Sequence, residues 1–588
     1  MISYKDNVFY MNTPAQSKIP SRFPAVEPEP RPRRPEVLMR PERLSVLQTS
    51  RLSATRLLMA KAIRERWKFE RLQWDIDERA RGTALYCIHT GAMPFDFIIH
   101  SFEPKMEGRM GRIIGQAWDM MAALVEGPVS AEDVRITGEE IKKLYAGRAT
   151  PGTLIWARSN RSARVFNHTV DSLAEGRQPD VATLAEACYL MRNTGLDGNG
   201  TFGTRSFRAL EDTHPLRRPL DAQMLSAYMM RVFSIDLVNH LARCRSASAA
   251  TLAPEIQRFL GVGNGSALGL NLYVNNHPRL IDAWLKAREQ AIIGAKRLPV
   301  RTRDAHLTRL LRLLEKAATY RRQDRMEYER FVASSEIARD LEKIIAVAQT
   351  LHGTGLVNGV AARYPLSALA DALEGQVHDE AFETFLGLLT ELVPELCDRL
   401  AENLGVDEEY CTEPDMAIGR LRDVLRAEYA WAFDMDLDSE ASRKYVWYKS
   451  ATAEEPRRGP RAEAGEVFNL GLDLPRLVRE LDRAIASLPP AMSTARLLLE
   501  RPALRFIVSR VQSLSGLEYH SPHMNMMGEE LVPCDITRLI NIGIHGLDKT
   551  RDYMQRALRG VIYQGAPTVE DIAKGADPDW FWPAEPVL

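Results

Sequence analysis

Hydrophobic residues recur at intervals of about three and four positions along most of this 588-residue chain. That spacing gathers apolar side chains on one face of a helix. It predicts helices at about 53–66, 108–127, 161–173, 182–191, 220–243, 254–260, 303–319, 335–351, 366–374, 379–403, 415–429, 474–487 and 493–514. We therefore expect a mainly α fold, a large multi-helix globular protein.

A different pattern, with polar residues at alternate positions, occurs at 83–89 and 95–100 on either side of Gly91-Ala92-Met93-Pro94. Alternation flanking a turn sequence predicts a small β-hairpin at about 83–100. The run at 444–449 predicts a minor extra strand.

The hairpin pattern also predicts how its two strands pair. If Gly91 faces Pro94, then His89 faces Asp96, and Cys87 lies on the same polar face, while the other face is uniformly apolar. A cross-strand carboxylate that orients an imidazole suits a general base, or a base that activates Cys87. The alternative is a structural His–Asp pair, or simply the solvent-facing side of the hairpin.

Two segments rich in glycine and asparagine, 195–205 and 261–279, are the main candidate binding loops. Both contain Gly-Asn-Gly followed by Thr or Ser, and glycine allows positive φ and close approach of a ligand to the backbone. The candidate substrate-binding residues here are Asn199, Arg205, Asn264, Ser266, Asn276 and Arg279. The alternative is that both segments are helix caps and turns. A dinucleotide fingerprint is not supported, because a helix rather than a strand is predicted before residue 261.

The second of these segments ends where another helix is predicted to begin, at Pro278. A helix N-terminus favours anions, and His277 beside it is a further candidate for proton transfer. Arg161 lies on a predicted helical stripe with Arg164 and His168. Such a cationic stripe suits an anionic substrate, or is an ordinary solvated helix face.

The net charge and the cysteine content limit the kinds of molecule that the protein is expected to bind. The net charge of −1 gives no support to nucleic-acid or membrane binding. The six cysteines include no Cys-x-x-Cys pair, which indicates reduced thiols and a cytoplasmic protein. His520 and His523 have an HxxH spacing, but no third ligand lies at a recognised spacing, so no metal site is predicted. The sequence leaves the cofactor unknown.

Four regions are predicted along the chain: a Pro-rich arm at 1–50, a helical core with the hairpin and both Gly/Asn segments at 51–300, a helical bundle at 301–430, and a C-terminal region at 431–588 that ends in an aromatic tail. The arm carries the basic sequence Arg31-Pro32-Arg33-Arg34 and is expected to be disordered or to wrap around its own domain or a neighbouring subunit. A homo-oligomer is expected.

These observations favour a soluble metabolic enzyme that acts on a small anionic metabolite, a carboxylate or a phosphate. Proton-transfer, lyase and hydrolase chemistry all remain open. The alternative is a non-catalytic helical binding or scaffold protein that assembles through its arm and its aromatic tail.

Overall fold

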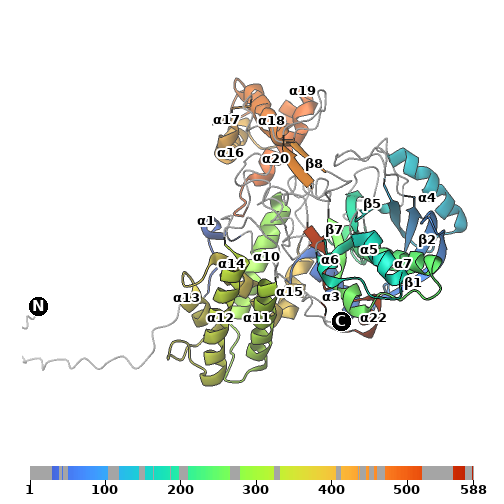
Figure 1. Cartoon of the computed structure of the whole chain (residues 1–588). Helices are drawn as coiled ribbons and strands as arrows, with labels where there is room; N and C mark the ends of the chain where they lie inside the picture. The colour runs from blue at the N-terminus through green and yellow to red at the C-terminus, as the bar shows by residue number, and fades with distance from the viewer. Residues whose placement is uncertain are drawn as a thin grey trace, which may run out of the picture.

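A curled, mixed β-sheet lies beside helices in this protein, which corrects the prediction of a mainly α fold with a small hairpin. The computed structural model describes residues 30–38, 43, 51–103, 118–144, 153–162, 165–185, 187–197, 210–264, 278–323, 332–404, 412–434, 436–437, 445–448, 456–459, 470–519, 560–575 and 586. Helices hold 56% of the described residues and strands 14%, so helix predominates by count, but the strands form one large sheet rather than a small hairpin (Figure 1).

The sheet has eight described strands in the order β1-β2-β3-β4-β5-β6-β7-β10. Their bounds are β1 Lys68–Ile76, β2 Gly82–His89, β3 Pro94–Ser101, β4 Met120–Glu126, β5 Thr153–Arg161, β6 Tyr189–Asp197, β7 Gly261–Asn264 and β10 Gly560–Ile562. Among these described strands, β6 and β7 pair in parallel and the other neighbours pair antiparallel.

Strand β4 lies within the helix predicted at 108–127, and burial explains the error. The strand is apolar on both faces: Met120 and Ala122 belong to the main core, whereas Met121 and Ala123 form a small cluster on the opposite face. A strand buried on both sides loses its alternation, and methionine and alanine are also good helix formers. Two other strands overlap the ends of predicted helices: β6 begins within the helix predicted at 182–191, and β5 ends at Arg161, where a helix was expected to start, whereas the helix after β5 begins at Val165.

The predicted hairpin is confirmed as β2 and β3, but its pairing is displaced by two residues. His89 lies opposite Pro94, and Asp96 lies opposite Cys87. The connection is a longer loop closed by Thr90, whose Oγ1 donates to the carbonyl oxygen of Met93 at 2.7 Å. A displacement by two keeps every side chain on its predicted face, but it separates His89 from Asp96.

One face of the sheet is covered by α7 (Asp221–Arg245), which confirms the long core helix predicted at 220–243. The hydroxyl of Tyr86 on β2 donates to Asp236 of α7 at 2.7 Å. The remaining helices of this part are α3 (Ala54–Arg64), α5 (Val165–Ala174), α6 (Val181–Ala185), α8 (Pro254–Phe259) and α22 (Val569–Lys574).

The opposite face is approached by α4 (Ala131–Leu144), which contacts β3. A Cβ atom at Gly138 would lie 3.0 Å from Cε1 of His100, so a glycine at this position lets the helix come close to the strand. His100 and Asp96 are therefore enclosed rather than exposed on a solvent face.

The C-terminal segment returns to the sheet edge as β10 and α22 (Figure 1). Arg231 of α7 is fully buried, and its guanidinium donates to the carbonyl oxygens of Leu260, Gln257, Ala566 and Pro567 at 2.7–3.1 Å. One arginine thus satisfies carbonyl groups from two chain segments more than 300 residues apart in sequence.

A group of helices that we call the bundle follows the sheet strands β1 to β7 along the chain. It contains α10 (Pro278–Lys296), α11 (Ala305–Gln323), α12 (Ser334–Thr354), α13 (Pro365–Leu373), α14 (Asp379–Leu389), the 3-10 turn η3 (Thr390–Leu392) and α15 (Pro394–Glu402). Helix α10 begins at Pro278, as predicted. The bundle and the sheet share one hydrophobic core.

A second, separate core lies in the C-terminal helices. It is built from α16 (Ile418–Glu428), α17 (Ala430–Asp434), α18 (Leu470–Ile485), α19 (Thr494–Glu500), the 3-10 turn η5 (Pro502–Leu504) and α20 (Arg505–Leu514). The short strands β8 (Tyr445–Tyr448) and β9 (Pro456–Gly459) pair with each other, and β8 is the minor strand predicted at 444–449.

Candidate functional site

The hairpin does not form the predicted His89–Asp96 pair. His89 is half exposed, and its ring lies 3.9 Å from Sγ of Cys87 and 3.6 Å from a carboxylate oxygen of Glu70. Asp96 is buried and accepts a hydrogen bond from the backbone N–H of Val129 at 2.7 Å. Asp96 therefore does not orient the His89 imidazole, which lies between Cys87 and Glu70 instead.

Cys87 also lacks the properties of a nucleophile. Burial, together with the neighbouring Asp96 carboxylate, raises the pKa of the Cys87 thiol to about 12. A reactive cysteine needs a lowered pKa and a positively charged neighbour. The raised pKa favours the protonated thiol of Cys87 over the thiolate.

The face of the sheet beneath α4 holds polar atoms that are enclosed without partners. Asp96 Oδ1, His100 Nε2 and Trp156 Nε1 are buried and make no hydrogen bond within the part of the chain that the structure describes. Burial lowers the pKa of His100 to about 4, so its imidazole is neutral at physiological pH. Asp96 and His100 lie four residues apart on β3, about 13 Å along the strand, so they do not converge on one atom.

The two Gly/Asn-rich segments follow strands that lie side by side. Strand β6 leads into the first segment and β7 leads into the second, and the two strands are parallel neighbours, with Asn193 opposite Asn264. Their carboxyl ends therefore face the same edge of the sheet. Both segments were predicted to follow helices, and the pairing of β6 with β7 was not predicted.

At two positions of the second segment, 261 and 263, close packing explains why the residue is glycine. A Cβ atom at Gly261 would lie 2.3 Å from the carbonyl oxygen of Ile562 on β10, and one at Gly263 would lie 2.8 Å from the Tyr189 ring. These glycines allow close packing of strands and of a ring. They give no evidence for approach of a ligand, whereas Gly265 and Gly269 lie outside the described residues.

Buried polar residues that the sequence reasoning missed lie at the same edge. Arg192 and Asn193 on β6 are both buried; Arg192 lies opposite Asn160 and Asn193 lies opposite Ser159 of β5. The signal was present in the sequence, because Arg-Asn follows the apolar run 187–191 directly. Because a helix was predicted at 182–191, Arg192 and Asn193 were taken to lie in the following loop and were not recognised as buried residues of a strand.

Two predicted arginines are already engaged within the fold. The backbone N–H of Arg161 donates to Asp119 at 2.8 Å, and its guanidinium lies 4.9 Å from the centroid of the Phe166 ring. Arg161 is thus at the end of β5 and not on a helical stripe. Arg279, in the first turn of α10, lies 3.6 Å from a carboxylate oxygen of Glu413 and is partly exposed.

The remaining predicted residues lie outside the part of the chain that the structure describes. They are Asn199, Arg205, Ser266, Asn276 and His277. For Asn264 the backbone position at the end of β7 is described, but not the side chain.

Comparison with protein-family models, curated proteins and solved structures gives no match for this chain. Within the described ranges, no three His, Cys, Asp or Glu side chains are grouped as metal ligands. None of the described helices is both long enough and apolar enough to cross a lipid bilayer.

Proposed function

We propose that this chain binds a small anionic molecule, a carboxylate or a phosphate, where β6 and β7 end. The observation that carries the proposal is the parallel pairing of these two strands, which places Asn193 opposite Asn264, so that both Gly/Asn-rich segments continue towards one edge of the sheet. In open sheets, ligands bind outside the carboxyl ends of parallel strands, where loops with free backbone N–H groups gather.

The surrounding groups have the chemistry that an anion needs. Arg192 and Asn193 are buried at this edge, and a cation and an amide are both hydrogen-bond donors. Helix α10 follows the second segment in sequence, and the N-terminus of a long helix has unpaired N–H groups and a positive dipole end. Arg279 is in its first turn, and an arginine fork matches the geometry of carboxylates and phosphates.

As an enzyme, the protein would use His277 for proton transfer, because the predicted pairing of Asp96 with His89 in the hairpin is not formed. His277 precedes Pro278 directly and thus adjoins the N-terminus of α10 in sequence. The proposal therefore assigns both substrate binding and proton transfer to the chain around the β6–β7 edge.

Calorimetric titration with inorganic phosphate and with succinate tests the binding site. We expect saturable binding of one of the two probes to the full chain. The substitution Arg279→Ala should weaken that binding by about 10- to 150-fold, as the loss of a charged hydrogen bond does.

The matched control is Arg322→Ala, which removes an arginine that pairs with Glu342 on the exposed surface of the bundle. This variant should bind the same probe as the unchanged chain does. Equal affinities for all three proteins, or no binding of either probe, would contradict the proposed site.

A further inference from the structure

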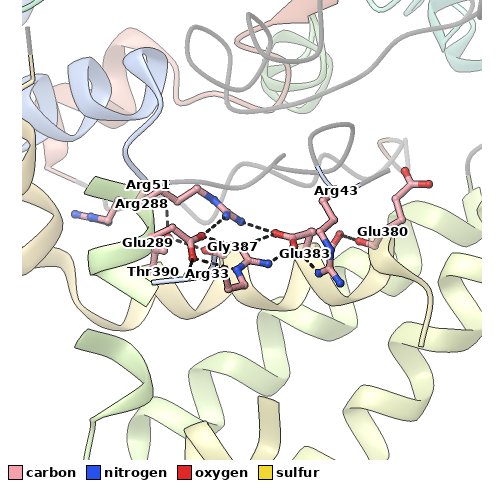
Figure 2. Close-up of polar contacts among 10 residues, drawn as sticks. Arg33, Arg43, Arg51, Arg288, Glu289, Glu380, Glu383, Gly387 and Thr390 are labelled. Atoms are coloured by element: carbon pink, nitrogen blue, oxygen red, sulfur yellow. Dashed lines mark hydrogen bonds and ion pairs between the residues drawn. The ribbon is translucent and has the colours of Figure 1, made fainter. Parts of the chain in front are cut away.

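The N-terminal arm contacts the bundle of its own chain through Arg33. The guanidinium of Arg33 donates to both carboxylate oxygens of Glu289 on α10, at 2.7 and 3.0 Å, and it also pairs with Glu383 on α14 (Figure 2). The backbone of the same residue is recognised as well. Its N–H donates to Glu289 at 3.2 Å, and its carbonyl oxygen accepts a hydrogen bond from the Tyr519 hydroxyl.

We call Glu289, Glu383 and Asp379 with the intervening Arg288 the acidic pocket of the bundle. Glu289 and Glu383 are almost completely buried, and Arg288 lies between them at 3.3–3.4 Å. These residues belong to α10 and α14, two regular helices of the shared core. Three carboxylates face one arginine, which leaves the pocket itself short of positive charge.

The arm supplies the missing charges. Besides Arg33, Arg43 places its guanidinium 3.1 Å from Glu383 and 3.1 Å from Asp379. With these two residues, three arginines balance three carboxylates. Burial by itself raises the pKa of Glu383, but the arginines, Arg33 first among them, outweigh it and lower that pKa to about 2.

The described part of the arm is held at two points. Arg33 is largely enclosed and lies just before the short helix α1 (Pro35–Leu38), whose Leu38 is fully buried in the shared core, whereas Arg31, Arg34 and Glu36 are exposed. One charged anchor and one apolar anchor, with backbone hydrogen bonds at the charged one, are contacts by which a docked peptide is recognised.

We propose that the acidic pocket is a binding site for an arginine-bearing peptide, and that the arm of this chain occupies it as an intramolecular ligand. The planar guanidinium of Arg33 pairs with the carboxylates of Glu289 and Glu383, and the Tyr519 hydroxyl donates a hydrogen bond to the peptide backbone. Because the arm is joined to the bundle by a short tether, its effective concentration at the pocket is on the order of millimolar. A free peptide therefore binds there only when the contacts between the arm and the pocket are weakened. This site is separate from the β6–β7 edge and does not depend on the function proposed there.

The test uses the full chain with Arg33→Ala and a fluorescent peptide of residues 28–45, followed by fluorescence anisotropy. We expect saturable binding to the Arg33→Ala chain, and binding at least about tenfold weaker to the unchanged chain, whose pocket is occupied. A peptide that itself carries Arg33→Ala should also bind at least about tenfold more weakly, because it lacks the bidentate ion pair.

The matched control is a peptide with Arg34→Ala, which removes an adjacent but exposed arginine. It should bind within about threefold of the unchanged peptide, since exposed charges contribute little. Equal losses for the Arg33→Ala and Arg34→Ala peptides would show unspecific attraction of basic residues and overturn the proposal. So would a folded Arg33→Ala chain that does not bind the unchanged peptide.

Circular dichroism establishes whether each variant is folded. Arg33→Lys serves as a second variant, because lysine keeps one charge in the pocket but lacks the planar fork. Its pocket should take up the peptide more weakly than that of the Arg33→Ala chain and more strongly than that of the unchanged chain. If neither variant folds, the arm is an integral part of the core rather than a removable occupant, and the proposal is wrong.

Discussion

His100 shows how one buried side chain responds to its surroundings. The sequence placed it on the polar face of a hairpin, where an imidazole titrates near neutral pH. In the fold, α4 covers that face, and Gly138 allows the helix backbone to come against the ring. Burial then lowers the pKa of His100 to about 4.

This shift makes stability depend on pH. Between pH 4 and 6.5 the unfolded chain binds a proton at His100 and the folded chain does not, so the contribution is complete above about pH 6.5 and is lost as the pH falls towards about 4. The difference is on the order of 3 kcal/mol. Urea denaturation of the unchanged chain and of His100→Gln at several pH values measures it.

The glutamine variant has no titrating group at this position, so its free energy of unfolding should vary less with pH over the same interval. Parallel pH profiles for the two proteins would show that His100 is not held neutral by burial.

At the scale of elements, the sheet depends on close approach of its strands at the β7–β10 edge. A side chain at position 261 has no room, because its Cβ atom would lie 2.3 Å from a backbone oxygen of β10. A backbone atom cannot rotate away as a flexible side chain can. The two strands would have to separate.

We therefore expect Gly261→Ala to destabilise the protein by about 1–3 kcal/mol, the usual cost of overpacking. Hydrogen exchange should become faster in residues 560–575, which form β10 and α22. The control is Gly353→Ala in α12, where a Cβ atom meets nothing within 4 Å and alanine favours the helix by up to about 1 kcal/mol. Unchanged exchange at residues 560–575 in the first variant would contradict the role of Gly261.

At the scale of the whole molecule, the described residues form two hydrophobic cores. One joins the sheet to the bundle, and the other lies within α16–α20. Links between the two parts include Asp282 of α10, which accepts the backbone N–H groups of Glu518 and Tyr519 at 3.0 and 2.8 Å. Tyr519 in turn holds the arm, so the arm, the bundle and the C-terminal helices meet at one place.

Separate cores should unfold in separate transitions. In scanning calorimetry we expect Leu481→Ala, in the core of α16–α20, to lower one transition temperature, and Leu341→Ala, in α12, to lower the other. Each truncation should cost about 2–5 kcal/mol in its own core. If either variant shifted the whole unfolding profile as one unit, the two cores would be thermodynamically coupled.

Much of the helical part was predictable from local pattern. The bundle helices, the core helix α7 and the start of α10 at Pro278 follow from apolar periodicity and from the preference of proline for the first turn. These signals lie within a few residues of the elements that they specify, so no distant contact is needed to read them.

The sheet and the candidate sites depended on contacts that a local pattern does not contain. Strands β4 to β6 are covered on both faces by distant segments, which removes the alternation that marks a strand. The position of Asp96 opposite Cys87, the parallel pairing of β6 with β7, and the insertion of Arg33 between Glu289 and Glu383 join residues that are up to 350 positions apart. The residue types alone showed which side chains can act as acids, bases or hydrogen-bond donors. The chain topology decided which of these side chains come into contact, because strand pairing and burial are properties of the assembled core.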